Sequence, residues 1–219
     1  MILTDAQIVE AYKKGDIVID PFDEKQIQAA SYDLRVGAQG ATTSTKKIVN
    51  LKDTGYLALQ PGDFGVVTCL EIVRLGPQHA ARIGLRSKYA RKGLIATTGP
   101  QIDPGYHGRL IIGITNLTPK PVSLPYKDDL LTVEFHRLEQ ASTHPYDGPY
   151  QGKMELGAEE IESVTETEGM ALSEMLTTLR SLTSNVGALT SQIKILKWTI
   201  PLIVGIGIAA ISVIVAVKH

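Results

Sequence analysis

Apolar residues in the first 150 or so positions of the chain fall into short runs separated by turn-forming pairs such as Pro61-Gly62 and Pro104-Gly105. Short strands with turn signals between them, without regular alternation with helices, are typical of a sandwich or barrel. We therefore expect a mainly β fold over this part of the chain. The runs that we interpret as strands include residues 17–19, 31–36, 64–69, 110–115 and 130–135.

The N-terminus predicts one helix before these strands. Thr4 is a residue type that caps helices, and Ile8, Val9 and Tyr12 recur at helical spacing after it. We expect a helix over residues 5–14 whose apolar face turns inward.

The C-terminal part of the chain has a different pattern, in which apolar positions alternate at spacings of three and four. This heptad repeat predicts a self-associating coiled-coil stalk over residues 170–197; a single amphipathic helix packed on its own globular part is the alternative. Residues 154–169 are acidic without a strong apolar period and predict a linker. The repeat positions are Leu172, Met175, Leu179, Leu182, Val186, Leu189, Ile193 and Leu196.

Residues 199–217 contain no charged side chain. At a rise of about 1.5 Å per residue, a helix of this length spans about 28 Å, close to the thickness of a hydrocarbon core. Trp198 and the lysines Lys197 and Lys218 flank the segment, where interfacial residues belong. We expect a transmembrane helix over residues 198–218. It would anchor the chain in a lipid bilayer by its tail and leave the head, residues 1–153, in the cytoplasm.

The charge and the cysteine content of the chain exclude several classes of function. The 219 residues carry a formal net charge of −1, so no global basic field indicates a nucleic-acid partner. Cys69 is the single cysteine, which excludes a disulfide framework and any zinc site with several cysteines, including that of the zinc deaminases.

Two segments of the head carry candidate chemistry. Residues 86–93 place four cations around Ser87, a cluster that suits a polyphosphate, although a solvated basic loop has the same composition. Residues 102–108 form a Pro-Gly turn that presents Asp103 and Tyr106. Asp103 is a candidate general base near phosphates, and an aspartate that stabilises the turn is the alternative.

At these residues the chain resembles the dCTP deaminase/dUTPase family over residues 1–153. The segments that carry the resemblance are GDIVIDPFDEKQIQAASYDLRVG, GLRSKYARKGL, IDPGYHGRL and HPYDGPYQGK. The resemblance implies a distorted β-barrel that assembles as a homotrimer, with deoxynucleoside triphosphate sites between subunits.

The resemblance also implies roles for individual residues. Asp33 matches an aspartate near the metal and triphosphate, and Mg²⁺ would be held by the triphosphate rather than directly by the protein. Arg86, Ser87 and Arg91 match the phosphate-binding loop, in which Lys88 replaces a second serine. The remaining matches are Asp103, which orients the attacking water; Tyr106, which packs on the sugar; Ile111, Ile112 and Gly113, whose backbone reads the pyrimidine; and Tyr146, Tyr150 and Lys153, which close over the nucleotide.

Gly113 departs from the deaminase pattern, which has a proton-shuttling glutamate ten residues after the aspartate of the IDPG motif. Glycine performs no acid–base chemistry, and residues 110–117 contain no acid. The sequence therefore favours a membrane-anchored dUTP diphosphatase that gives dUMP and pyrophosphate. A catalytically weak deoxynucleotide sensor that signals through its anchor, and residual dCTP deaminase activity, are the alternatives.

Overall fold

The structure is a computed structural model that describes residues 1–166, 180–190, 192–194, 196, 197, 199, 200 and 205. The chain divides into two units, Met1–Ser173 and Glu174–His219, and each is described by itself. The elements of the first unit are α1 (Asp5–Lys14), β1 (Ile17–Asp20), η1 (Glu24–Gln26), β2 (Ile27–Gln28), β3 (Ser31–Thr42), β4 (Val49–Asn50), α2 (Leu51–Thr54), β5 (Tyr56–Leu59), β6 (Phe64–Leu75), β7 (His79–Leu85), α3 (Ser87–Ala90), β8 (Leu94–Ala96), β9 (Gln101–Ile102), β10 (His107–Asn116), β11 (Val122–Pro125), β12 (Asp129–Arg137) and α4 (Ala158–Glu166).

Helix α1 forms where the sequence predicts it. The Thr4 amide donates to Oε1 of Gln7 at 3.0 Å, which satisfies a backbone donor ahead of the helix. Gly15, at φ +76°, ends the helix in the left-handed conformation that glycine adopts without strain. Ile8 and Ala11 are buried, so the apolar face of α1 packs inward as expected.

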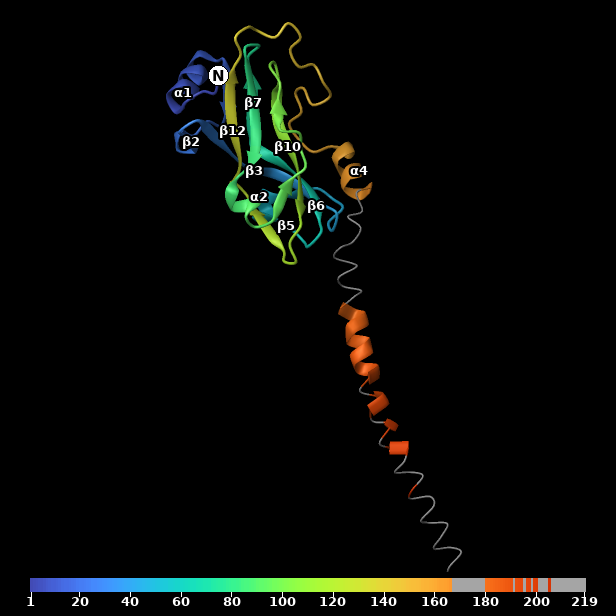
Figure 1. Ribbon diagram of the computed structural model, residues 1–219. Coiled ribbons are helices and arrows are strands. Elements are labelled where there is room, and N and C mark those ends of the chain that lie inside the picture. Colours follow the sequence, from blue (N-terminus) through green and yellow to red (C-terminus); the bar gives the residue numbers. More distant parts are fainter. Residues whose placement is uncertain (167–179, 191, 195, 198, 201–204, 206–219) are drawn as a thin grey trace, which may run out of the picture. The chain divides into compact units, whose positions relative to one another are not determined.

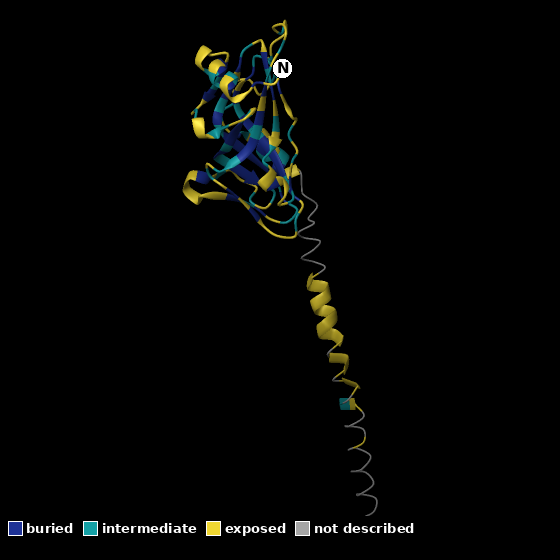
Figure 2. Ribbon diagram, turned by 60° about the vertical axis from the view of Figure 1, so that its left-hand side comes forward, coloured by how far each residue is buried: buried dark blue, intermediate teal, exposed yellow. Residues whose placement is uncertain are grey.

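The core of the first unit is one antiparallel sheet of ten strands in the order β8-β10-β6-β3-β12-β7-β9, with β1 on β6 and with β2 and β4 on β3. The sheet curls into a half-barrel (Figure 1), and its buried positions gather inside the curl (Figure 2). Strands β5 and β11 form a separate ribbon. The mainly β prediction is confirmed, and where a distorted barrel was expected the sheet forms a curled half-barrel. The largest fully buried side chains include Tyr32, Leu34, Ile112, Ile114 and Phe135.

Residues 154–169, predicted as an acidic linker, contain helix α4. Leu156 and Val164 are buried in a second apolar cluster with Ala41 of β3 and Val66 of β6. Burial of these side chains holds α4 against the sheet. Residues 154–166 therefore pack as part of the folded unit, and residues 167–169 lie outside the described residues.

The predicted stalk, residues 170–197, lies partly outside the described residues. The described residues 180–190 are helical, and Leu182, Val186 and Leu189 expose 52%, 60% and 57% of their surface. The helix agrees with the heptad pattern, and its association into a coiled coil stays a prediction.

The membrane location predicted from residues 198–218 is corrected. A span needs about 20 consecutive apolar residues in one helix, and within the described part of the chain no helix reaches the required length and apolar character. Most of residues 198–218 lies outside the described residues.

Candidate functional site

A cavity of about 590 Å³ lies between β10, the connection from β8 to β9, and helix α4. Strand β6 adds Phe64 and Val66 to its wall. The cavity is mostly apolar with a few polar groups, as small-molecule sites usually are. The sequence-predicted residues that line it are Asp103, Tyr106, Ile111, Gly113, Tyr146 and Tyr150.

Asp103 and Tyr106 stand at the turn that leads into β10. Oδ1 of Asp103 accepts a hydrogen bond from Nε2 of Gln101 at 2.6 Å. Tyr106 is 6% exposed, its hydroxyl donates to the Arg109 carbonyl at 3.0 Å, and burial raises the pKa of its phenol. Gly105 has φ +85°, and a Cβ there would meet Pro145 at 2.6 Å. The turn therefore requires glycine, and it fixes an acceptor and a neutral ring at the cavity wall.

Gly113 lies in β10 opposite Val66 of β6. A Cβ on Gly113 would lie 2.5 Å from Oγ1 of Thr97 and 3.1 Å from the Phe64 ring. The Gly113 amide donates to Oγ1 of Thr98 at 2.7 Å. Thr97 and Thr98, which sequence reasoning missed, thus lie where a side chain larger than that of Gly113 would have to fit. Ile112, between two cavity residues, directs its side chain into the main core instead.

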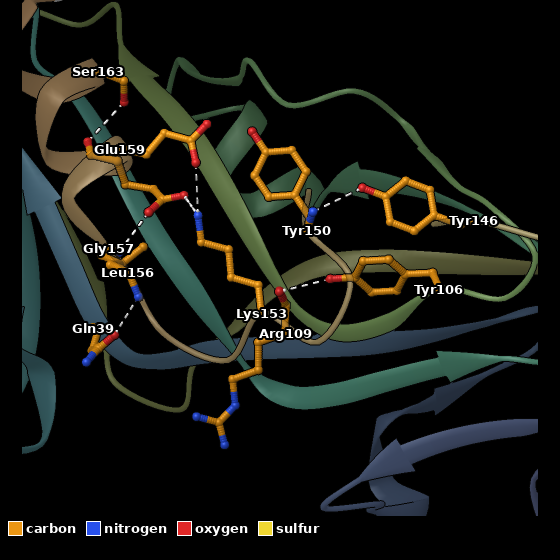
Figure 3. Close-up of polar contacts among 11 residues, drawn as sticks. Gln39, Tyr106, Arg109, Tyr146, Tyr150, Lys153, Leu156, Gly157, Glu159 and Ser163 are labelled. Carbon is orange, nitrogen blue, oxygen red and sulfur yellow. Dashed lines mark hydrogen bonds and ion pairs between the residues drawn. The ribbon is translucent and has the colours of Figure 1, made fainter. Parts of the chain in front are cut away.

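The segment 146–153, here called the strap, crosses the cavity after β12. The Tyr146 amide donates to the Pro104 carbonyl at 2.7 Å, and the Tyr146 and Tyr106 ring centroids lie 5.7 Å apart. The Tyr150 amide is bonded to the Tyr146 hydroxyl at 3.3 Å (Figure 3). Lys153 ends the strap and directs its ammonium toward α4, where it binds Glu160 and, at 3.4 Å, Glu159.

Helix α4 contributes Glu159, Glu160 and Ser163 to the cavity wall, and sequence reasoning missed all three. Burial alone would raise the pKa of the Glu160 carboxyl, but the bonds from Lys153 and the Gly157 amide lower it overall. The sequence did contain one signal for helix α4: Ile161 and Val164 are apolar and three residues apart, a spacing that puts them on one helix face.

The predicted phosphate-binding residues lie elsewhere. Arg86 follows β7, and its guanidinium is bonded to Asp33, which is 1% exposed. Thr132 of β12 donates to the other oxygen of Asp33 at 2.9 Å. Arg86 therefore compensates a buried carboxylate of its own chain.

The neighbouring helix α3 has a second such arrangement. Lys88 binds Oδ1 of Asp128 at 2.6 Å, and the Tyr89 hydroxyl donates to the other oxygen of that carboxylate. Burial alone would raise the pKa of the Asp128 carboxyl, but these two bonds lower it overall. Ser87 and Arg91 belong to the same loop, and the Arg91 side chain is exposed.

Strand pairing shows how far apart the two groups of residues are. Ile102, next to Asp103, pairs with Ala81 of β7, and Arg86 lies five positions further along the chain. At about 3.3 Å per residue, this separation is roughly 17 Å. Among the described residues that line the cavity, none comes from the phosphate-binding loop. One chain thus holds the aspartate and the arginine at two separate places.

Direct metal ligands were not expected from the sequence. Within the described residues, no three His, Cys, Asp or Glu side chains gather into a group that could hold a metal ion. Asp33, predicted to lie near the metal and triphosphate, is bonded to Arg86 and Thr132.

Comparisons with known proteins place these features in context. Residues 2–138 match the family model described as dCTP deaminase-like. The chain is 36% identical over 156 residues to a dCTP deaminase of Thermococcus sibiricus, covering 71% of this chain and 95% of the relative. It is 31% identical over 175 residues to a dUMP-forming dCTP deaminase of Methanothermobacter thermautotrophicus, covering 71% of this chain and 89% of the relative.

A solved structure with a similar fold is the 2'-deoxycytidine 5'-triphosphate deaminase of Agrobacterium tumefaciens. The TM-score is 0.54 at 21% sequence identity. The match covers 77% of this chain and 53% of that one, so the chain spans about half the length of the solved protein.

Proposed function

The chain belongs to the dCTP deaminase-like family, and from that premise we propose that it is a dUTP diphosphatase, converting dUTP to dUMP and pyrophosphate. The proposal rests on one observation: Asp103 and Gly113 both line the same cavity. A carboxylate is available there for activating water, while position 113 has no acid–base group for a reaction on the base.

The reaction assigned to this site is an in-line attack on the α-phosphorus. Asp103 orients a water molecule and accepts its proton as the water oxygen bonds to phosphorus. The bond from the α-phosphorus to the oxygen bridging to the β-phosphate breaks, and pyrophosphate leaves. Tyr106 and the strap tyrosines enclose the nucleoside, which holds the phosphorus at the distance that the attack requires.

The phosphate groups need cations that the cavity wall lacks. Arg86, at the start of the phosphate-binding loop, lies roughly 17 Å from the aspartate along one chain, so the proposed site takes this loop from a second subunit. A homotrimer in which each cavity faces the loop of a neighbour supplies it. The exposed Arg91 guanidinium would then stabilise the charge that develops on the phosphates, while Arg86 stays paired with Asp33.

A magnesium ion bound together with the triphosphate would neutralise part of the phosphate charge. Its ligands would be phosphate oxygens, and the chain's own contribution is the placement of Asp103 and of the basic loop.

Deamination of dCTP is the second candidate, and one observation favours it besides the names of the relatives. Glu159 and Glu160 of α4 line the same cavity as Gly113, so carboxylates reach this space from another part of the chain. Glu160 is held by Lys153 and by the Gly157 amide. Glu159, 66% exposed, has a longer contact with Lys153 at 3.4 Å and is the acid–base group such a reaction would use.

The experiment that separates the candidates is product analysis with the full chain and Mg²⁺. We expect dUTP to give dUMP and pyrophosphate, with dCTP left unchanged. Release of ammonia from dCTP would establish the deaminase instead, and binding of neither nucleotide would overturn both proposals.

A further inference from the structure

Helix α4 is fixed to the sheet rather than loosely attached. Val164 is fully buried, and Leu156 is 6% exposed in the cluster that includes Ala41 and Val66. The Leu156 amide also donates to Oε1 of Gln39 in β3 at 2.8 Å (Figure 3). A side chain on this helix therefore has a defined position relative to the cavity.

Glu160 uses both of its carboxylate oxygens. Oε2 accepts from the Gly157 amide at 2.7 Å, and Oε1 binds the ammonium of Lys153. The Glu160 side chain is 7% exposed and that of Lys153 is 19% exposed. The two form a charge pair that is largely withdrawn from water.

Lys153 connects this pair to the strap. Its carbonyl accepts from the Arg109 amide of β10 at 2.8 Å, which fixes its backbone beside the cavity. Its ammonium lies 5.2 Å from the centroid of the Tyr150 ring, within the range of a cation–π contact. Glu160, Lys153 and Tyr150 thus form a continuous chain of contacts from α4 to the cavity.

Tyr150 is 43% exposed although it lines the cavity. An accessible aromatic ring at the wall of a cavity offers a stacking surface to a planar heterocycle. The position of that ring depends on the lysine beside it.

Lys153 has two conceivable roles, as a ligand of the phosphates or as a holder of the strap. Withdrawing its ammonium to a phosphate would leave the carboxylate of Glu160 buried without a cation, and such a loss is strongly unfavourable. The contacts therefore favour the second role.

We propose that Glu160 and Lys153 are positioning residues that hold the Tyr150 ring against the base of the bound nucleotide. The inference rests on the proposed function, because it concerns the same cavity. It assigns to α4, outside the matched segment 2–138, a part in recognition of the nucleoside.

The test measures binding of deoxyuridine and of a non-hydrolysable dUTP analogue to the full chain. We expect Glu160→Gln and Lys153→Met to weaken both ligands by the same factor, about tenfold, because a stacking contact is lost from the base. The charge-swapped double variant Lys153→Glu/Glu160→Lys should not recover the loss, because a carboxylate at position 153 makes no cation–π contact with the Tyr150 ring. Glu162→Gln, an exposed change on the same helix, is the matched control and should bind both ligands as the unaltered chain does.

A further variant keeps the test independent of the stability of α4. Tyr150→Leu removes the ring and leaves α4 unaltered, so it should weaken binding of both ligands by about the same factor as Glu160→Gln does. If only the triphosphate analogue binds more weakly, Lys153 is a phosphate ligand and the inference is overturned. Unchanged or tighter binding of both ligands by Glu160→Gln would overturn it as well. If the unaltered chain binds no deoxynucleotide, the proposed function itself fails.

Discussion

The cavity wall around Asp103 and the loop around Arg86 differ in how their charged groups are satisfied. In the cavity, Asp103 takes one hydrogen bond from a neutral glutamine amide and faces a space of about 590 Å³. In the loop, Arg86 and Lys88 are each paired with an aspartate of the same chain. The cavity is organised to receive a ligand, whereas the loop is organised by its own ion pairs. This difference agrees with the proposal that one chain carries two half-sites.

The largest effect is expected in the cavity half, from Asp103→Asn. The amide has nearly the same shape but accepts no proton, so hydrolysis of dUTP should fall about 10²- to 10⁴-fold. Binding of a non-hydrolysable analogue should change little. Steady-state kinetics and calorimetric titration measure the two quantities, and an unchanged turnover number would remove Asp103 from the chemistry.

Mixing subunits tests whether the halves belong to different chains. Arg91→Ala is suitable because the Arg91 side chain is exposed, and we expect both it and Asp103→Asn to be nearly inactive alone. Random co-assembly in a trimer should restore both groups at about a quarter of the sites. Co-expression with two affinity tags and an activity assay measures the recovery. No recovery in verified mixed assemblies would argue for a site within one chain.

In the loop half, Arg86→Ala should act mainly on folding. Asp33 is 1% exposed, and the substitution leaves its carboxylate with only the Thr132 hydroxyl as a side-chain partner, at a cost of about 3 kcal/mol in the free energy of unfolding. The double variant Arg86→Ala/Asp33→Asn should recover part of that loss. Urea unfolding measures both values; full stability of Arg86→Ala would mean that the ion pair contributes little.

A smaller effect on stability is expected from Gly113→Ala. The added Cβ would lie 2.5 Å from Oγ1 of Thr97, so Thr97 must rotate or shift, which costs about 1 kcal/mol. Thr97→Ala should remove most of that penalty in the double variant. Thermal unfolding of the single and double variants gives the coupling, and additive effects would show that the two positions do not interact.

The smallest effect is a response to acid at the cavity rim. Because the pKa of the Glu160 carboxyl is lowered below its ordinary value of 4.5, its stabilising contribution is complete above that value and is lost as the pH falls through the folded-state pKa. The Gly157 amide, which donates to Glu160, should report this titration in NMR spectra recorded from about pH 6 down to about pH 3. Glu160→Gln should remove the response. A Gly157 shift that persists in this variant would assign it to another group.

Local patterns predicted those parts of the fold that local interactions determine. Helix α1 has its apolar spacing and its glycine stop within one short segment, and its bounds were correct. Strand β6, by contrast, extends to Leu75, well beyond the predicted run of residues 64–69, because its ladders with β10 and β1 continue there. Pairing partners far away in the sequence set its length.

The site divides in the same way. The IDPG motif singled out Asp103 and Tyr106, and the family pattern singled out Gly113, ten residues after Asp103; the structure brings all three to one cavity. Thr97 and Thr98 were missed because they matter only through their proximity to Gly113, which arises when β8 pairs with β10. Helix α4 was missed because Val164 packs against Ala41 and Val66, and an acidic segment with few apolar residues resembles a linker until those partners are known.

The docking of α4 has a practical consequence for protein production. A fragment cut after Lys153 would expose Ala41 and Val66 to solvent and would separate the lysine from the carboxylate that binds it. Such a fragment would be prone to aggregation, and its ligand affinity would understate that of the intact chain. The shortest fragment expected to crystallise with an intact pocket runs through Glu166.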